Sequence, residues 1–228
     1  MINNKKVIAL LPMKGHSERV PKKNLKLFNG VPLYRVILST LLSSKYIDEV
    51  LINTDCNFIP EDVKNHFPTK VSIRERPFEI RGDMVSMNKI IEDDLKNTDG
   101  GIYLQTHSTN PLLKMDSLDG AIEEMIHVER PYDSIFSVTK IQTRFYDKDG
   151  KAVNHNPSEL IRTQDLPPIY EENSCLYIFT KKSFKEAGGK RIGNNPKMYE
   201  IDKLEAIDID NMEDFILAEA IHKTINKQ

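Results

Sequence analysis

Short apolar runs alternate along the chain with segments whose apolar residues recur every three or four positions. The apolar runs are rich in β-branched residues and have the length of strands; they cover residues 7–12, 49–54, 70–75, 101–106 and 133–138. The helix-like segments between them cover residues 31–44, 83–97 and 116–128, with Asp83 and Asp116 where N-caps are expected. Apolar strands separated by helices predict an α/β fold, a mainly parallel sheet with helices on both faces.

Residues 140–172 interrupt this alternation. They contain the turn signals DKDG and NP, a PP pair and few periodic apolar positions. We interpret them as an insertion into a single domain of residues 1–228. Beyond the insertion, residues 173–180 predict a strand that returns to the core sheet, and a strand-like stretch then leads into a terminal helix from about residue 212.

Composition narrows the class of protein. A chain of 228 residues with 39% hydrophobic content and a formal net charge of -2 is expected to be soluble and globular, without general attraction to nucleic acid or anionic membranes. Cys56 and Cys175 have no paired spacing, which favours a reducing compartment and argues against a structural zinc site. No apolar run approaches the roughly twenty residues that span a bilayer, so we expect a cytoplasmic protein.

Positive charge gathers directly after the first apolar run. Lys14, Arg19, Lys22 and Lys23 fall within the stretch LLPMKGHSERVPKKN, which also contains Gly15. Ligands of parallel sheets bind beyond the carboxyl ends of the strands, so this loop is expected at the ligand edge. It lacks the spacing of a Walker P-loop and of a dinucleotide fingerprint. An anion nest for a polyphosphate is favoured, and a solvated basic loop is the alternative.

Two acidic residues near the C-terminus have the spacing of a metal site. Asp208 and Asp210 point to the same side of an extended segment, where they could share one hard divalent cation with phosphate oxygens. The alternative is that Asp210 caps the helix that follows, and spacing alone leaves the two equal. At the end of another predicted strand, Gln105 lies at the ligand edge, whereas His16 and His107 have no visible partner and are not favoured as bases.

The stretch PMKGHSERVPKKN (12–24), followed by NGVPL (29–33), resembles the first-loop signature of the acylneuraminate (CMP-sialic acid) cytidylyltransferases and their relatives acting on KDO, pseudaminic and legionaminic acids. Further matches follow in the same order over nearly the whole chain. They are YIDEV (46–50), NTD (53–55), Arg76-Pro77 with Asp83 and Ser86, Gln105 with TNPL (109–112), Arg162 with QDLPP (164–168), Asn173 with YIF (177–179) and IDID (207–210).

The resemblance implies a Rossmann-like fold of the nucleotide-diphospho-sugar transferase type and an enzyme that transfers CMP from CTP to a hydroxyl of an acidic, sialic-acid-like sugar, releasing pyrophosphate. It implies Mg²⁺ as cofactor and a homodimer, in which the insertion reaches over the sugar site of the neighbouring subunit. The catalytic residues it implies are Arg19, Lys23, Asp208 and Asp210, the last two holding the metal. The nucleotide-binding residues are Leu11, Pro12, Met13, Lys14, Gly15, Ser17, Asn24, Arg76 and Ser86, and the sugar-binding residues are Gln105, Arg162 and Tyr177.

Two departures from the family pattern leave alternatives open. Lys14 stands where the family usually has Arg, which keeps the charge without the bidentate fork. Glu171-Glu172 stand where many sialic acid enzymes place an Arg, so two anions replace a carboxylate-binding cation. The alternatives are GTP in place of CTP, a smaller acidic acceptor, or a homologue that binds nucleotide without turnover. The Asp208/Asp210 pair with Lys23 speaks against the last.

Overall fold

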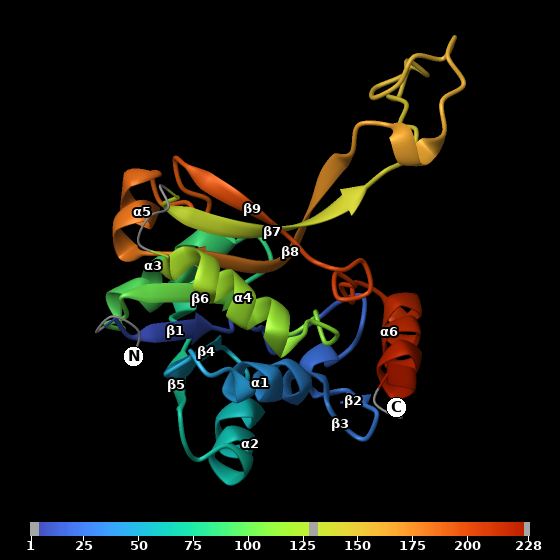
Figure 1. Cartoon of the computed structure of the whole chain (residues 1–228). Coiled ribbons are helices and arrows are strands. Elements are labelled where there is room, and N and C mark those ends of the chain that lie inside the picture. Colours follow the sequence, from blue (N-terminus) through green and yellow to red (C-terminus); the bar gives the residue numbers. More distant parts are fainter. Residues whose placement is uncertain (1–4, 128–131, 226–228) are drawn as a thin grey trace.

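A seven-stranded sheet forms the centre of the computed structural model, which describes residues 5–127 and 132–225 (Figure 1). The strand order is β5-β4-β1-β6-β8-β7-β9. The strands are β1 (Val7–Leu10), β4 (Glu49–Thr54), β5 (Val71–Glu75), β6 (Ile102–Thr106), β7 (Ser134–Ile141), β8 (Ile169–Phe179) and β9 (Pro196–Glu200). Only β8 runs antiparallel to its neighbours, so the predicted mainly parallel α/β sheet is confirmed. A separate small hairpin joins β2 (Leu27–Phe28) to β3 (Val31–Pro32).

Helices cover both faces of the sheet, as alternate residues of its central strand show. Val7 and Ala9 of β1 belong to a buried cluster with the apolar stripes of α1 and α4. Ile8 and Leu10 point the other way, into a cluster with Ile91 of α3. The helices are α1 (Leu33–Ser43), α2 (Phe58–His66), α3 (Met87–Lys96), α4 (Met115–Ile126), α5 (Lys181–Glu186) and α6 (Met212–Ile225), with short 3-10 turns η1 (Lys23–Leu25), η2 (Phe78–Ile80) and η3 (Thr163–Asp165).

Two helix starts differ from the predicted ones. The second predicted helix begins at Met87, because the side chain of Ser86 accepts the amide N–H of Asn88 at 3.2 Å and caps it. Asp83 is therefore not a cap; its carboxylate pairs with the ammonium of Lys14. The third begins at Met115, which leaves Asp116 in the first turn, and its predicted last residue, 128, lies outside the described residues.

Several short elements escaped the sequence pattern. α2 buries only Ile59 and Val63, and β9 leaves alternate residues exposed, so neither produces a continuous apolar signal. α5 is one and a half turns long and is held by a capping box between Thr180 and Ser183. Such weakly amphipathic elements are stabilised by tertiary packing rather than by local propensity.

The predicted insertion is an arm that projects from the body of the molecule (Figure 1). β7 and β8 continue past the sheet as a two-stranded ribbon, and residues 142–168 form its end. β8 begins at Ile169 and not at residue 173, so Glu171 and Glu172 lie within the ribbon. The first residues of β8 are exposed because no apolar core packs against them. Their sequence therefore lacks the apolar pattern of a strand and was assigned to the insertion.

The segment before α6 brings the C-terminal part of the chain to the first loop. The predicted strand-like stretch is not a strand, but Ile209 donates its N–H to the carbonyl of Thr109 at 2.9 Å. Ile209 is buried beside Val20, whereas Asp208 and Asp210 on either side are exposed. The alternation that the sequence predicted is therefore present. Over the described part of the chain, no helix is long and apolar enough to cross a membrane, and the cytoplasmic location stays a prediction.

Candidate active site

The stretch after β1 continues along β4 before it turns into the first loop. Leu11 and Met13 donate their N–H groups to the carbonyls of Leu51 and Asn53 at 2.9 and 3.0 Å. The side chains of Leu11, Pro12 and Met13 are buried in this ladder. If these three residues contact nucleotide as predicted, they do so through main-chain atoms at the edge of the sheet.

Two polar anchors hold the first loop in place. Asn24 is buried; its Nδ2 donates to the carbonyl of Lys14 at 2.8 Å, and its Oδ1 accepts the hydroxyl of Ser108 at 2.7 Å. The N–H of Gly15 donates to Asp55 at 2.6 Å. A β-carbon at Gly15 would lie 3.1 Å from the main chain of Cys56, so the close approach that needs glycine is to the protein itself. Asn24 and Gly15 therefore position the loop, and Ser17 lies half-buried between them.

The four predicted catalytic residues lie together, although they come from opposite ends of the chain. Arg19 donates from Nη2 to Asp210 Oδ1 at 2.9 Å, and Lys23 donates from Nζ to the carbonyl of Ile209 at 2.6 Å. Burial and the neighbouring cations lower the pKa of Lys23, while Asp208 and Asp210 oppose that shift. The cluster therefore places two cations and two carboxylates at the carboxyl ends of the strands.

The two carboxylates are not engaged in capping the helix. Oδ1 of Asn211 accepts the N–H groups of Glu213 and Asp214 at 2.8 and 3.0 Å, so Asn211 is the N-cap of α6. Asp208 keeps access to solvent, but the protein atoms around it raise its pKa, and the charge of Asp210 adds to that rise. Two carboxylates that repel each other at an open site suit a divalent cation.

A second polar cluster lies beside the first, where β6 pairs with β8. Gln105 and Tyr177 are partners in this register and both are buried. Arg191, from the loop after α5, donates from Nη1 to Gln105 Oε1 at 2.5 Å, and its guanidinium lies 3.7 Å from the ring centre of Tyr177. The hydroxyl of Tyr177 donates to Glu172. Gln105 and Tyr177 are two of the predicted sugar-binding residues, and we call the group formed by Gln105, Tyr177, Glu172 and Arg191 the sugar cluster.

His107 lies between the two clusters. Its Nε2 is 3.1 Å from Nε2 of Gln105. Burial lowers the pKa of His107 to about 4, and the charges of Arg191 and Lys23 contribute to the shift. The imidazole is therefore neutral near pH 7.

A sequence model of the family described as Cytidylyltransferase matches residues 8–226. The chain belongs to the cytidylyltransferase family. It is accordingly an enzyme of the type that the first-loop signature implied.

Relatives and solved structures agree with this assignment. The chain is 25% identical to a pseudaminic acid cytidylyltransferase of Campylobacter jejuni subsp. jejuni serotype O:2 over 96% of this chain and 97% of the relative. It is 28% identical to N-acylneuraminate cytidylyltransferase A of Danio rerio over 93% of this chain, which spans 50% of that longer relative. The structure of a CMP:2-keto-3-deoxy-manno-octonic acid synthetase complexed with CTP superposes with a TM-score of 0.70 at 12% identity, covering 96% of this chain and 99% of that one, and supports the fold.

A second structural neighbour has a related fold. The 4-diphosphocytidyl-2C-methyl-D-erythritol synthase of Anaerococcus prevotii superposes with a TM-score of 0.69 at 15% identity, over 97% of this chain and 98% of that chain. Two solved structures therefore share the fold of this cytidylyltransferase.

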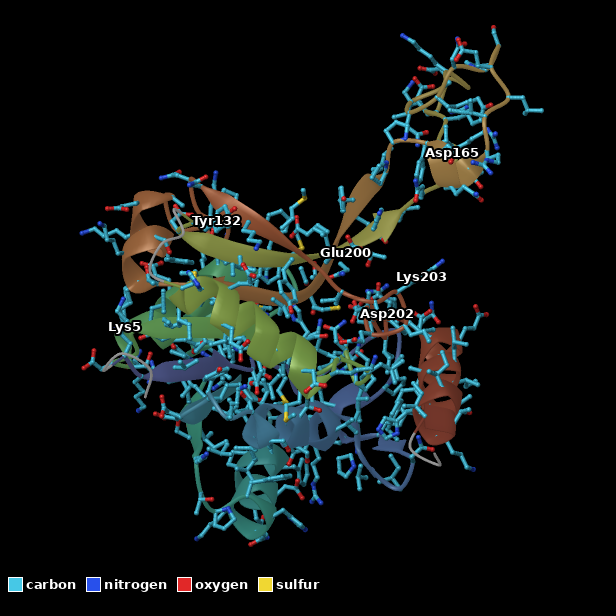
Figure 2. The ribbon with its side chains drawn as sticks, viewed as in Figure 1. Lys5, Tyr132, Asp165, Glu200, Asp202 and Lys203 are labelled. Carbon is cyan, nitrogen blue, oxygen red and sulfur yellow. The ribbon has the colours of Figure 1, made fainter. Side chains whose placement is uncertain are left out.

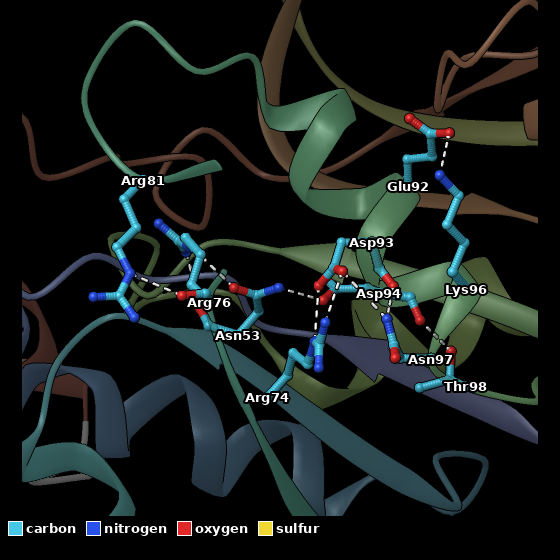
Figure 3. A network of polar contacts seen from close by, with 10 residues as sticks. All are labelled: Asn53, Arg74, Arg76, Arg81, Glu92, Asp93, Asp94, Lys96, Asn97 and Thr98. Carbon is cyan, nitrogen blue, oxygen red and sulfur yellow. Dashed lines mark hydrogen bonds and ion pairs between the residues drawn. The ribbon is translucent and has the colours of Figure 1, made fainter. Parts of the chain in front are cut away.

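Arg76 lies beneath the first loop of this cytidylyltransferase rather than in the open site. Only 3% of the residue is exposed. Its Nη2 donates to the carbonyls of Met13 and Asn53 at 3.2 and 2.9 Å, and its Nε donates to Oδ1 of Asn53 at 2.9 Å. Figure 3 shows this network continuing through Asn53 to Asp94 of α3. These contacts give Arg76 a structural role that the resemblance did not imply.

Arg162 lies apart from the other predicted sugar-binding residues. It forms a bidentate pair with Asp165 at 2.6 and 3.2 Å, and Asp165 is on the projecting arm (Figure 2). Gln105 and Tyr177 lie in the central sheet. Within one chain the structure therefore unites only two of the three predicted sugar-binding residues.

Sequence reasoning missed Arg191, Asn211 and Asp55 as site residues. Arg191 follows a GG pair in a stretch without periodicity, and nothing in the sequence indicates that this loop returns over β8. Asn211 directly precedes a helix and could have been recognised as its cap from residue type alone. Asp55 directly follows a predicted strand, so its position at the ligand edge of the sheet could have been predicted.

Proposed function

We propose that this cytidylyltransferase transfers CMP from CTP to a hydroxyl of an acidic, sialic-acid-like sugar and releases pyrophosphate. The proposal rests on one observation: two cations of the first loop lie beside two carboxylates from the C-terminal part of the chain. These residues are Arg19 and Lys23, and Asp208 and Asp210. The names of the Campylobacter and Danio relatives support the class of acceptor, and the CTP complex of the first structural neighbour supports the nucleotide. Attack on the α-phosphate depends mainly on positioning and charge neutralisation, which this cluster can supply.

Asp208 and Asp210 are the residues that would hold Mg²⁺. Both side chains lie on the exposed side of the 207–210 segment, and neither caps α6, because Asn211 accepts the N–H groups at the start of that helix. The repulsion between the two carboxylates favours a bound dication. No group of three or more His, Cys, Asp and Glu side chains suited to a metal occurs among residues 5–127 and 132–225. Mg²⁺ commonly takes only one or two carboxylates and completes its shell with water and phosphate. When bound, it would neutralise charge on the phosphate oxygens.

Arg19 and Lys23 are assigned to the triphosphate. Arg19 pairs with Asp210 in this structure, at an exposed position where an exchange of partners costs little. Lys23 is held more firmly, since its ammonium lies under the 208–210 segment. Lys14, paired with the exposed Asp83, is a third cation that can exchange partners.

Replacement of either main cation should weaken CTP binding. We expect Arg19→Ala and Lys23→Ala each to raise the Kd of CTP by about tenfold, or about 1.4 kcal/mol, measured by isothermal titration calorimetry. Lys22→Ala removes an equal charge from an exposed position of the same loop and should change the Kd by less than about twofold. The assignment is wrong if both site variants stay within about threefold of the wild type.

The activity itself is tested by pyrophosphate release from CTP and from GTP with a panel of 2-keto-3-deoxy sugar acids and smaller acids. We expect release that depends on CTP and on at least one sugar acid. Release with GTP but not with CTP would show that GTP is the nucleotide substrate. Nucleotide binding without release in any combination would support a non-catalytic homologue and contradict the proposal.

We also propose that the arm joins two copies into a homodimer. Leu160 is 95% exposed at its end, with Val153 and Ile161 also exposed, and Arg162 cannot join the sugar cluster of its own chain. Exposed apolar residues on a projecting ribbon are typical of an interaction surface. We expect the mass of a dimer by light scattering at micromolar concentration. A fully active monomer would contradict this proposal.

A further inference from the structure

A cavity of about 380 Å³ opens between the start of α3 and the loop after α5. It is lined by Ser86, Met87, Asn88, Lys190, Arg191 and Ile192. The guanidinium of Arg191 connects it to the sugar cluster, because the same group contacts Gln105 and stacks on Tyr177. The cavity therefore adjoins the sugar cluster through Arg191.

The cavity wall carries positive charge that the described residues do not neutralise by direct contact. Arg191 donates to the neutral amide of Gln105 and lies over the ring of Tyr177, and no carboxylate within the described ranges forms an ion pair with it. Burial lowers the pKa of Arg191, as expected for a cation removed from water. Lys190 is exposed and has no ion pair in the described part of the chain. A half-buried guanidinium without an anion is costly unless a ligand supplies one.

Two acidic residues of β8, Glu171 and Glu172, lie on the strand that carries Tyr177. Glu172, whose charge influences Arg191, accepts the hydroxyl of Tyr177 on the ribbon strand. Glu171 is exposed on the same strand. Glu172 therefore engages Tyr177, and the guanidinium that contacts the sugar cluster comes from the loop after α5.

We propose that Arg191, assisted by Lys190, binds the carboxylate of the acceptor sugar in this cavity. The proposal rests on the proposed function, which requires an acidic acceptor. The contact with the ring of Tyr177 and the hydrogen bond to Gln105 fix the position of the guanidinium, whose planar fork can bind a carboxylate through two N–H groups. A carboxylate held there lies next to the sugar cluster, because the same guanidinium contacts Gln105, whose Nε2 is 3.1 Å from Nε2 of His107.

The test compares substrates and variants in steady-state pyrophosphate release. Arg191→Met should raise the KM of the accepted acid by about tenfold or more and leave the KM of CTP within about twofold. Lys190→Met should raise the acid KM by a smaller factor, and Arg191→Lys should recover part of the loss. Lys185→Met, an exposed lysine outside this cavity, is the matched control and should change neither constant.

The methyl ester of the same acid separates charge recognition from general damage. The wild type should prefer the acid strongly, and Arg191→Met should lose most of that preference. Equal loss with acid and ester would overturn the proposal, as would an unchanged acid KM. Lys190→Met, at an exposed position, carries the test if Arg191→Met does not fold.

Failure of the proposed function is recognised separately, as absence of pyrophosphate release by the wild type with every acid. In that case, titration calorimetry with N-acetylneuraminate and with 2-keto-3-deoxy-octonate, on CTP-saturated and metal-free protein, decides the proposal. Binding to the wild type that Arg191→Met weakens by about tenfold supports it. Absence of binding to the wild type, or equal binding to both proteins, overturns it.

Discussion

Asp208→Asn and Asp210→Asn should each lower kcat by about a hundredfold or more, a loss of about 2.7 kcal/mol of transition-state stabilisation. Both carboxylates face the open site beside Lys23, and a metal held there stabilises charge that grows as the α-phosphate is attacked. The loss should therefore appear in turnover more than in CTP affinity. Pyrophosphate release at saturating substrates and a separate CTP titration measure the two effects.

Asn211→Ala is the matched control for these substitutions. It removes the side chain that accepts the N–H groups of Glu213 and Asp214, and it should lower the free energy of unfolding by about 1 kcal/mol without lowering kcat. If the aspartate variants keep their turnover and lose only thermal stability, the metal assignment is refuted. The site would then have to bind its metal through other residues.

Arg76→Met should destabilise the protein by about 3 kcal/mol or more. The guanidinium is buried and donates to two carbonyls and one amide oxygen of Met13 and Asn53, which would lose their partners (Figure 3). Chemical denaturation measures the effect. Arg81→Met removes a neighbouring guanidinium with greater exposure and should cost much less. Similar losses from both variants would contradict the structural role of Arg76.

The cost of Arg76→Met should depend on pH because Asp94 is buried nearby. Burial raises the pKa of Asp94 from 3.8 to about 7, and the charge of Arg76 opposes that rise. A folded pKa above the unfolded one means that stability is lost as pH rises from about 4 to 7. Without Arg76 the folded pKa should rise further, so the loss continues to higher pH. The difference from wild type should thus be larger at pH 8 than at pH 6.

Asp94→Asn provides the control for this pH dependence. The amide cannot ionise, so adding Arg76→Met to Asp94→Asn should give a loss that is the same at both pH values. A pH-dependent difference that persists in the double variant would show that another group is responsible.

The predictable part of the site lies close to strand ends. The carboxyl end of β1 and the loop after it were readable because a continuous apolar run stops at a cluster of cations. The same reasoning placed Gln105 at the end of β6. The alternation of acids and isoleucines at 207–210 predicted one shared face, and burial of Ile209 bears this out even without a strand.

Sequence reasoning was weaker where a residue acts through distant partners. Arg76 was assigned to nucleotide from its place in a motif, but its carbonyl partners are Asn53 of β4 and Met13 in the stretch after β1. Arg162 was grouped with Gln105 and Tyr177, yet it pairs with Asp165, which lies on the projecting arm (Figure 2). Arg191 had no pattern at all, since its position depends on how the loop after α5 crosses the neighbouring strand.

Periodicity and local charge were enough to predict the α/β class, the insertion and the cationic first loop, because none of these requires knowledge of distant contacts. The motifs in their order also indicated the family. Which charges meet became known only from the folded chain: Arg19 pairs with Asp210, Asn211 caps the last helix, and Arg191 lies on Tyr177. Such pairings depend on the packing of segments far apart in the chain, and a one-dimensional pattern carries no record of that packing.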